Sequence, residues 1–373
     1  MRFELPRASI CFRHFERQDA CRLRSEFDPY PLLDSDGEFT DDVVVEAAAA
    51  SAPHFVDVQN PAADGCVTGS DGHDLHIVEG GRACAIPRFD GGPPFRFRSQ
   101  QGFPVRTLVR SLLRPALQLA LLHHGCVAVH GTAVDLDGAG IVVAGWSESG
   151  KTETALALLE GGASFVSDKW TIVAPEHELA PFPISVGVRR WVLPYLPRLK
   201  SSLPRAARLQ LGLAAAAAVG TRPIRRGGRS GRLPQLASTN LERGVTLLER
   251  AALAPSQVSR IYGAERPVMR TELRAVVLLT TVSSDTVALR TVQPRWAARR
   301  LARSASYERR GFFDLHRRLR YSFPDSLDDL ESTVEISEEQ LLTQLLEGTM
   351  LFEATAPFPT DPRRVADAIL RHL

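Results

Sequence analysis

An eight-residue segment, Gly145-Trp-Ser-Glu-Ser-Gly-Lys-Thr152, limits the fold of this chain more than any other part of its sequence. It matches the pattern G-x-x-x-x-G-K-[ST] at every required position. A β-branched run, Ile141–Ala144, comes directly before it, and good helix formers at Thr152–Glu160 follow it. A further short strand is expected at Phe165-Val166. A strand, a glycine turn, a helix and a strand in this order predict an α/β fold.

The residue types of this loop suit a nucleoside triphosphate. Glycines let the backbone curl so that its N–H groups converge on phosphate oxygens, and the N-terminus of the next helix adds a positive dipole. Lys151 would reach the β- and γ-phosphates, and the Thr152 hydroxyl would ligate Mg²⁺. The predicted nucleotide-binding residues are Gly145, Ser147, Glu148, Ser149, Gly150, Lys151, Thr152 and Glu153. A GTPase is disfavoured, because the chain has no N-K-x-D tetrad that would select guanine.

Two further side chains are candidates for the same site. Asp168 follows Phe165-Val166-Ser167, so it should emerge at the carboxyl end of that strand, on the same edge as the loop. There it could act on Mg²⁺ or on a substrate hydroxyl, whereas the alternative is a strand-end carboxylate that caps a turn. His130, directly before Gly131, fits a site residue and a structural histidine equally well.

The rest of the chain indicates two domains joined by a helix. Residues 1–104 are acidic, with short apolar runs separated by Gly and Pro, and predict a smaller, mostly β or α+β domain. Leucines at helical spacing predict a connecting helix at 105–124, in which Pro115 either produces a kink or starts a second helix. Residues 125–373 are predicted to form a second domain, the P-loop domain, which contains the glycine-rich loop. Further strands are expected at 275–279 and near 287–289, and Asp361-Pro362 should begin the last helix.

Three features of the second domain are less clear from sequence. Ser337 and Gln340 fit a capping box that would open a helix at Glu338. Arg189 and Arg190, on an expected strand, could contact phosphates or a partner, although solvated charges are the simpler interpretation. An Arg-rich insertion at about 196–236 is expected to be a helix followed by a mobile basic loop, more often solvated than bound to an acidic partner.

The composition of the chain limits the classes of partner that are expected. A net charge of +2 argues against a bulk attraction to nucleic acid or membrane. No apolar stretch approaches the ~20 residues of a membrane span, no targeting segment is visible, and the five cysteines contain no CxxC pair, so a cytoplasmic protein with reduced thiols is expected. Of 45 basic residues only Lys151, Lys169 and Lys200 are lysines, which draws attention to each of them.

From His130-Gly131 through the loop, Glu153–Leu156 and Gly162 to Asp168, the sequence resembles the C-terminal catalytic domain of HPr kinase/phosphorylase. The resemblance implies a P-loop fold of the HPr kinase/phosphoenolpyruvate carboxykinase type. It also implies ATP- and Mg²⁺-dependent phosphorylation of a Ser-type hydroxyl on a protein or peptide. By position, Lys151 and Thr152 would hold phosphate and Mg²⁺, His130 would lie near the transferred phosphate, and Asp168 would accept the hydroxyl proton. Relatives of this kind are often homo-oligomers.

Lys169 departs from the family pattern, which has a second aspartate there. A cation in place of a metal ligand either neutralises phosphate directly or reduces metal handling, and it argues against the reverse, phosphorolytic reaction. The Arg-rich insertion is a second departure and suggests a different acceptor. Relatives of this kind also phosphorylate precursor peptides of natural products, so the resemblance implies such a peptide as one possible acceptor.

Three functions follow from this sequence. The leading hypothesis is an ATP-dependent kinase acting on a Ser/Thr-type hydroxyl of a protein or peptide. The second is a nucleotide-binding regulatory or assembly module without transfer activity. The third is a kinase for a small hydroxyl-bearing metabolite.

Overall fold

The structure is a computed structural model that describes residues 1–33, 40–49, 53–61, 66–89, 92–213, 249–324 and 329–373. Most of the expected Arg-rich insertion, including its basic loop, lies outside the described residues, although residues 205–213 are helical. Within the described part, no helix has both the length and the apolar character needed to cross a bilayer.

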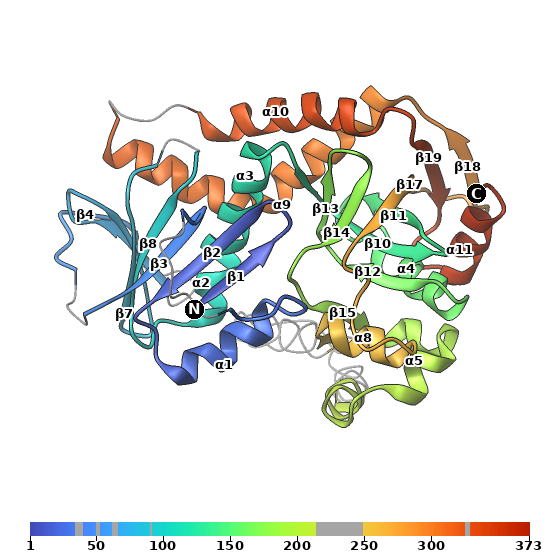
Figure 1. Cartoon of the computed structure of the whole chain (residues 1–373), viewed down its shortest axis with the longest axis horizontal. Helices are drawn as coiled ribbons and strands as arrows, with labels where there is room; N and C mark the ends of the chain where they lie inside the picture. The colour runs from blue at the N-terminus through green and yellow to red at the C-terminus, as the bar shows by residue number, and fades with distance from the viewer. Residues whose placement is uncertain (34–39, 50–52, 62–65, 90–91, 214–248, 325–328) are drawn as a thin grey trace, which may run out of the picture.

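The first hundred residues build one eight-stranded mixed sheet with the strand order β1-β2-β3-β8-β7-β6-β5-β4 (Figure 1). Its strands are β1 (Arg2–Leu5), β2 (Ala8–Arg13), β3 (Val43–Ala48), β4 (Asp57–Pro61), β5 (Cys66–Ser70), β6 (Leu75–Glu79), β7 (Arg82–Ile86) and β8 (Phe95–Gln100), with α1 (Arg17–Glu26) after β2. Residues alternate along β8: Phe95 and Phe97 are buried while Arg96 and Arg98 face solvent. This period of two gives the sheet one apolar face to cover.

The helix expected at 105–124 is a core element. It consists of α2 (Val105–Leu108), one π-helical segment, η1 (Val109–Leu113), and α3 (Arg114–His123). Pro115 does not end it: the wider π-helical segment lies directly before this proline, which has no N–H to donate. Residues 115–121 are all buried. The alanines and leucines among them belong to one apolar cluster that also contains Phe3 and Phe95 of the first sheet and Ile172 of the second.

The second sheet has nine strands of mixed direction and carries the P-loop. They are β9 (Val127–Val129), β10 (Gly131–Leu136), β11 (Ala139–Gly145), β12 (Ser164–Ser167), β13 (Thr171–Ala174), β14 (Glu178–Pro181), β17 (Thr271–Thr281), β18 (Ala288–Thr291) and β19 (Met350–Ala356). β11 lies between β10, which is antiparallel to it, and β17, which is parallel. The strands expected in 125–373 are therefore present, and the α/β fold class is confirmed.

A small two-stranded unit and its short helices lie beside the P-loop helix. β15 (Val186–Arg189) pairs with β16 (Arg250–Leu253). Around this pair are the 3₁₀ helix η2 (Arg190–Tyr195), α5 (Pro197–Ser202) and α8 (Pro255–Ile261). Apolar residues of this unit share a core with the P-loop helix, α4 (Lys151–Glu160), and with α11 (Pro362–Leu370). The pairing therefore brings Arg189 and Arg250, 61 positions apart in sequence, into register.

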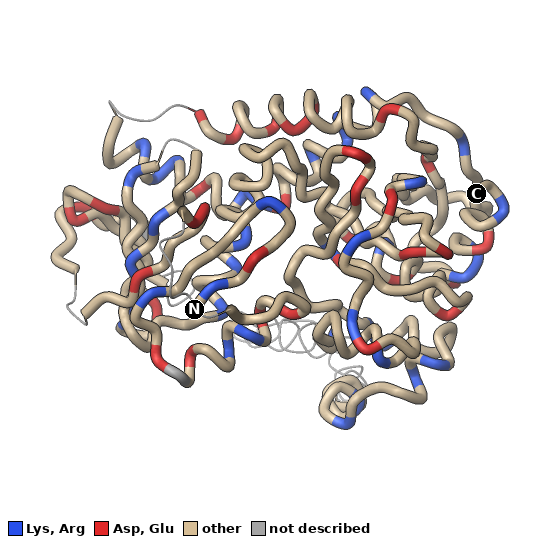
Figure 2. Tube along the Cα trace, in the orientation of Figure 1, with Lys and Arg blue, Asp and Glu red and all other residues tan. Residues whose placement is uncertain are grey.

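Two long helices run side by side past both sheets: α9 (Pro294–Ser322) and α10 (Leu330–Leu345) (Figure 1). Figure 2 shows acidic positions along α10. Arginines of α9 pair with three of these residues: Arg299 with Glu339, Arg303 with Glu335, and Arg317 with Glu331. α9 contacts both β6 of the first sheet and β11 of the second. It therefore links the first sheet to the strand that carries the P-loop.

Of the two helix starts predicted in the second domain, one is right. The Asp361 side chain accepts a hydrogen bond from the Arg363 amide, as an N-cap should. The capping box is wrong, because α10 begins at Leu330 and contains Ser337 in its interior. The helix extends further because Val334 and Glu338 are buried, the latter in an ion pair with Arg309 of α9. Tertiary packing overrides the local start signal here.

Candidate functional site

The loop between β11 and α4 adopts a conformation that only glycines fit at two places. Gly145 has φ +144°, and a Cβ there would lie 2.6 Å from the Leu279 carbonyl oxygen. Gly150 has φ +92° and caps α4, and a Cβ would lie 3.1 Å from the Phe358 ring. A side chain at either position would combine backbone strain with a steric contact. These two glycines of the motif therefore set the course of the loop.

The loop leaves backbone donors free to bind an anion. Among the described residues, no acceptor is hydrogen-bonded to the amides of residues 147–151. Helix α4, which runs for ten residues, starts at the end of this stretch. A run of unpaired N–H groups at a helix N-terminus attracts phosphate through both hydrogen bonding and the helix dipole.

Lys151 lies under the loop. Its side chain is largely buried, and its Nζ donates to the carbonyl oxygens of Gly145 at 3.1 Å and Trp146 at 2.6 Å. Burial lowers the pKa of Lys151 to about 8, while the nearby carboxylates of Glu308, Asp168 and Glu153 act in the opposite direction. The ammonium therefore contacts the loop and also lines the pocket that the loop encloses.

The Asp168 carboxylate accepts hydrogen bonds from the hydroxyl groups of two threonines, one of which belongs to the phosphate-loop motif. Thr152 and Thr132 each donate to its Oδ1 at 2.7 Å, and the residue is only 1% exposed. Its Oδ2 is buried and has no hydrogen-bond partner among the described residues. An orphaned carboxylate oxygen beside a threonine hydroxyl is an oxygen donor set that suits a hard cation such as Mg²⁺. Asp168 and Thr152 therefore fit the metal role expected of them.

His130 has a defined tautomer. Ser304 of α9 donates its hydroxyl proton to the Gly145 carbonyl at 3.1 Å, so the 2.8 Å contact between His130 Nδ1 and Ser304 Oγ requires the imidazole to donate from Nδ1. Burial, with the cations of Lys151, Lys169 and Arg309, lowers the pKa of His130 to about 2. The neutral ring therefore keeps a free lone pair on Nε2, which lies 4.0 Å from Glu308.

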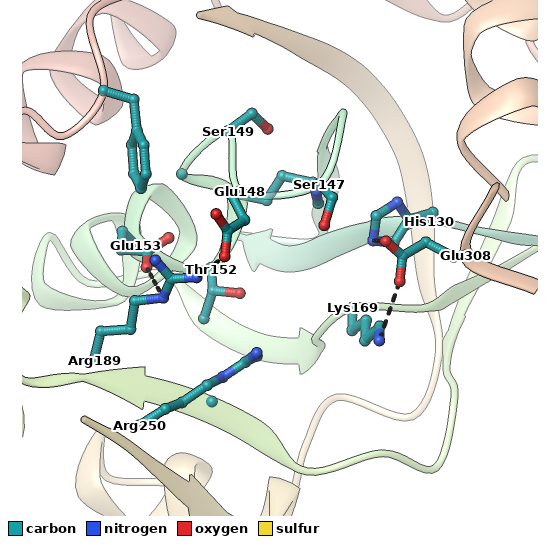
Figure 3. A pocket seen from close by; sticks show the side chains of 14 residues that line it. His130, Ser147, Glu148, Ser149, Thr152, Glu153, Lys169, Arg189, Arg250 and Glu308 are labelled. Carbon is teal, nitrogen blue, oxygen red and sulfur yellow. Dashed lines mark hydrogen bonds and ion pairs between the residues drawn. The ribbon is translucent and has the colours of Figure 1, made fainter. Parts of the chain in front are cut away.

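Lys169 and Glu308 form an ion pair at one end of the pocket. The Lys169 Nζ lies 3.2 Å from Glu308 Oε2, and Figure 3 shows the two groups beside His130. Lys169 adopts φ +60°, a left-handed conformation that is costly for a residue with a Cβ. Such strain at a site residue is typical of a functional constraint. The turn places this lysine against a carboxylate from α9.

The opposite end of the pocket is built by arginines. Arg189 donates to Glu148 at 2.8 Å and lies 3.8 Å from Glu153, two acidic residues of the loop and of α4 (Figure 3). Burial raises the pKa of Glu153, and the Arg189 charge opposes that shift. The Arg250 guanidinium lies directly over Gly187, where any Cβ would clash with it.

All of these groups surround one pocket with a volume of about 110 Å³. Its lining includes these predicted residues: His130, Ser147, Glu148, Ser149, Gly150, Lys151, Thr152 and Glu153. Lys169 and Arg189 line it as well. Gly145 and Asp168 stand behind the lining, and Arg190 is not part of it.

Six residues at the site were missed by the sequence analysis: Thr132, Gly187, Arg250, Ser304, Glu308 and Phe358. Thr132, the second residue of β10, lies two positions after His130, so its closeness in sequence to a candidate residue could have suggested it. Ser304 and Glu308 are one helical turn apart, but no local pattern connects them with a loop so distant in sequence.

Comparisons with known proteins give little beyond this geometry. No protein-family model matches the chain, and no curated protein matches it. Among solved structures, it is similar to the structure of the Hpr(Ser) kinase/phosphatase from Coxiella burnetii. That similarity has 10% sequence identity and a TM-score of 0.27, and it covers 66% of this chain and 89% of that one. No conclusion about function is drawn from this similarity.

Proposed function

We propose that this protein is an ATP-dependent kinase that transfers the γ-phosphate to a hydroxyl group. One observation carries the proposal: the Thr152 side chain of the phosphate loop is hydrogen-bonded to the buried, half-satisfied carboxylate of Asp168. Free loop amides would hold the phosphate chain, and Lys151 would neutralise its β- and γ-oxygens. Phosphoryl transfer depends on such positioning and charge stabilisation.

Thr152 and Asp168 would hold Mg²⁺. When bound, Mg²⁺ would neutralise charge on the phosphate oxygens. Thr132 keeps the Asp168 carboxylate in place through its own hydrogen bond. His130, neutral and anchored to Ser304, is suited to accept a hydrogen bond near the transferred phosphate.

The finer assignment follows the sequence resemblance. We propose a P-loop domain of the HPr kinase/phosphoenolpyruvate carboxykinase type and a Ser/Thr-type hydroxyl on a protein or peptide as the acceptor. The pairing of Lys169 with Glu308 leaves a cation where the family has a second carboxylate. This supports transfer from ATP without the reverse phosphorolysis.

The same ion pair also favours a second candidate, a nucleotide-binding module without transfer activity. A lysine beside the metal position would weaken Mg²⁺ binding through charge repulsion.

Incubation with γ-labelled ATP, Mg²⁺ and separate pools of Ser- and Thr-centred degenerate peptides, free serine and simple sugars tests the function. We expect the wild type to label peptides, and Lys151→Ala and Asp168→Ala to lose labelling. Lys200→Ala, which removes an exposed lysine on α5, is the matched control and should label normally. Wild-type ATP binding without labelling of any pool would favour the binding module, and labelling of serine or sugars alone would favour a small-molecule kinase.

A further inference from the structure

We propose that Glu308 is the catalytic base, the group that accepts the proton of the acceptor hydroxyl, and that Lys169 holds it in the resting protein. This assignment rests on the proposed kinase function and identifies the side of the pocket where the acceptor enters. It gives Glu308 the role that the sequence resemblance implied for Asp168.

The surroundings of Asp168 suit a metal ligand better than a base. Its Oδ1 already accepts hydrogen bonds from Thr152 and Thr132, so this oxygen has both of its lone pairs engaged. The residue is almost completely buried and does not line the pocket. Its other oxygen, Oδ2, is the atom that would bind Mg²⁺ under the proposed function, which leaves no oxygen of Asp168 for an acceptor hydroxyl.

Glu308, in contrast, is a pocket-lining carboxylate on a rigid element. Its side chain is 11% exposed, and its nearest charged partner is Lys169 at 3.2 Å. Ser304, one turn earlier on the same face of α9, is hydrogen-bonded to the Gly145 carbonyl. This contact fixes the helix, and with it Glu308, against the phosphate loop.

His130 is the other group at this end of the pocket that could accept a proton. Its Nε2 lone pair is free, but burial and three neighbouring cations make protonation of the ring unfavourable. The imidazole is therefore better placed to orient the acceptor or the Glu308 carboxylate than to take the proton itself. Glu308 is the remaining choice among the described pocket residues at this end.

The two ends of the pocket are lined by different charged side chains. Arg189 and Arg250 lie at one end, whereas His130, Lys169 and Glu308 lie at the other (Figure 3). Two arginines suit the phosphates nearer the nucleoside, since guanidinium groups bind phosphate oxygens in pairs. The terminal phosphate would then point toward Lys169 and Glu308.

The transfer step balances with these groups alone. The acceptor oxygen forms a bond to the γ-phosphorus, the bond from that phosphorus to the β,γ-bridging oxygen breaks, and ADP leaves with the electron pair. The hydroxyl proton moves to the Glu308 carboxylate and then to solvent. Lys169, once attracted by the phosphate, releases Glu308 for this role and neutralises the transferred group.

The test compares Glu308→Gln, Glu308→Asp and Asp168→Asn with the wild type, using γ-labelled ATP and the Ser-peptide pool. We expect Glu308→Gln to lower kcat by about 100-fold or more, the usual contribution of a general base, with the Kd for ATP and the Mg²⁺ midpoint unchanged. Glu308→Asp keeps the carboxylate and should recover part of the rate. Asp168→Asn should instead raise the Mg²⁺ midpoint for ATP binding, measured without turnover.

Asp314→Asn is the matched control, because Asp314 is an exposed carboxylate on the same helix. It should leave kcat and the Kd for ATP unchanged. Equal kcat values for Glu308→Gln and the wild type would overturn the assignment of Glu308 and leave the kinase function intact. A wild type that binds ATP but labels no acceptor would overturn both.

Discussion

At one end of the pocket beside the phosphate loop, Arg189 is paired with Glu148 and Glu153, acidic residues of the loop and of α4. At the other end, Lys169 is paired with Glu308, which comes from a helix far away in sequence. The first pairing joins β15 to the phosphate loop and its helix, whereas the second joins the turn after β12 to α9. Under the proposed function, the arginine end would hold the nucleotide and the Lys169–Glu308 end would meet the acceptor.

Lys151 lies between the two ends, so its loss should affect both. We expect Lys151→Met to raise the Kd for ATP and to lower kcat together, with a fall in kcat/KM of about 100- to 1,000-fold, because a buried charge facing the phosphates is removed. Steady-state kinetics and equilibrium ATP binding measure the two effects. Lys200→Met should change neither. A Lys151→Met protein with a normal Kd would place Lys151 at the acceptor end alone.

His130, at the Lys169–Glu308 end of the pocket, should make the folded protein less stable at low pH. His130 is neutral in the fold, with a pKa near 2, while an unfolded histidine binds a proton below its ordinary pKa of 6.5. The unfolded state therefore gains protons first, and the free energy of unfolding should fall by roughly 1.4 kcal/mol per pH unit below pH 6.5. Urea unfolding at several pH values should show a shallower fall for His130→Gln. His73→Gln, at an exposed turn, should keep the wild-type slope.

Two glycines with left-handed backbone conformations can distinguish an effect on the course of the phosphate loop from an effect of backbone strain alone. Gly150 and Gly162 have φ of +92° and +107°, but only at Gly150 would an added Cβ meet another residue, Phe358. Each Gly→Ala change should lower the free energy of unfolding by about 1–2 kcal/mol. Only Gly150→Ala should also weaken ATP binding, measured by titration calorimetry. Equal ATP affinity in both variants would show that the loop tolerates a changed course.

The arginine end should give the smallest effect. We expect Arg189→Gln to raise the Kd for ATP by about threefold to tenfold with little change in kcat, because a partly exposed charge contributes about 1 kcal/mol. This is the reverse of the pattern expected for Glu308→Gln. Arg190→Gln, the adjacent position outside the pocket lining, is the control. A drop in kcat without a change in Kd for Arg189→Gln would contradict the division of the two ends.

The sequence was informative where the site is contiguous. The phosphate loop, its flanking strand and helix, and the position of Asp168 depend on glycine conformation and on strand order, which are local properties. Lys169 could be singled out because lysine is rare in this chain. Its partner could not, since the arginine-rich sequence of α9 resembles any amphipathic surface helix, and only the tertiary fold brings Glu308 to the loop.

The arrangement of strands and helices was predictable only where it depends on local sequence. Short apolar runs between glycines indicated strands in residues 1–104, but nothing local determines that β8 pairs with β3 or that Pro115 sits in an unbroken helix. The start of α10 depended on the buried pair of Glu338 and Arg309. These features require contacts between residues that sequence patterns do not connect.

Helix α9 also determines how the chain can be divided. While Ser304 and Glu308 face the phosphate loop, Phe312, Phe313 and Leu319 further along the helix belong to the core that contains the first sheet. Expressing residues 125–373 alone would uncover these aromatic and aliphatic side chains. We expect such a fragment to aggregate and to lose nucleotide binding, so assays of the pocket call for the intact polypeptide.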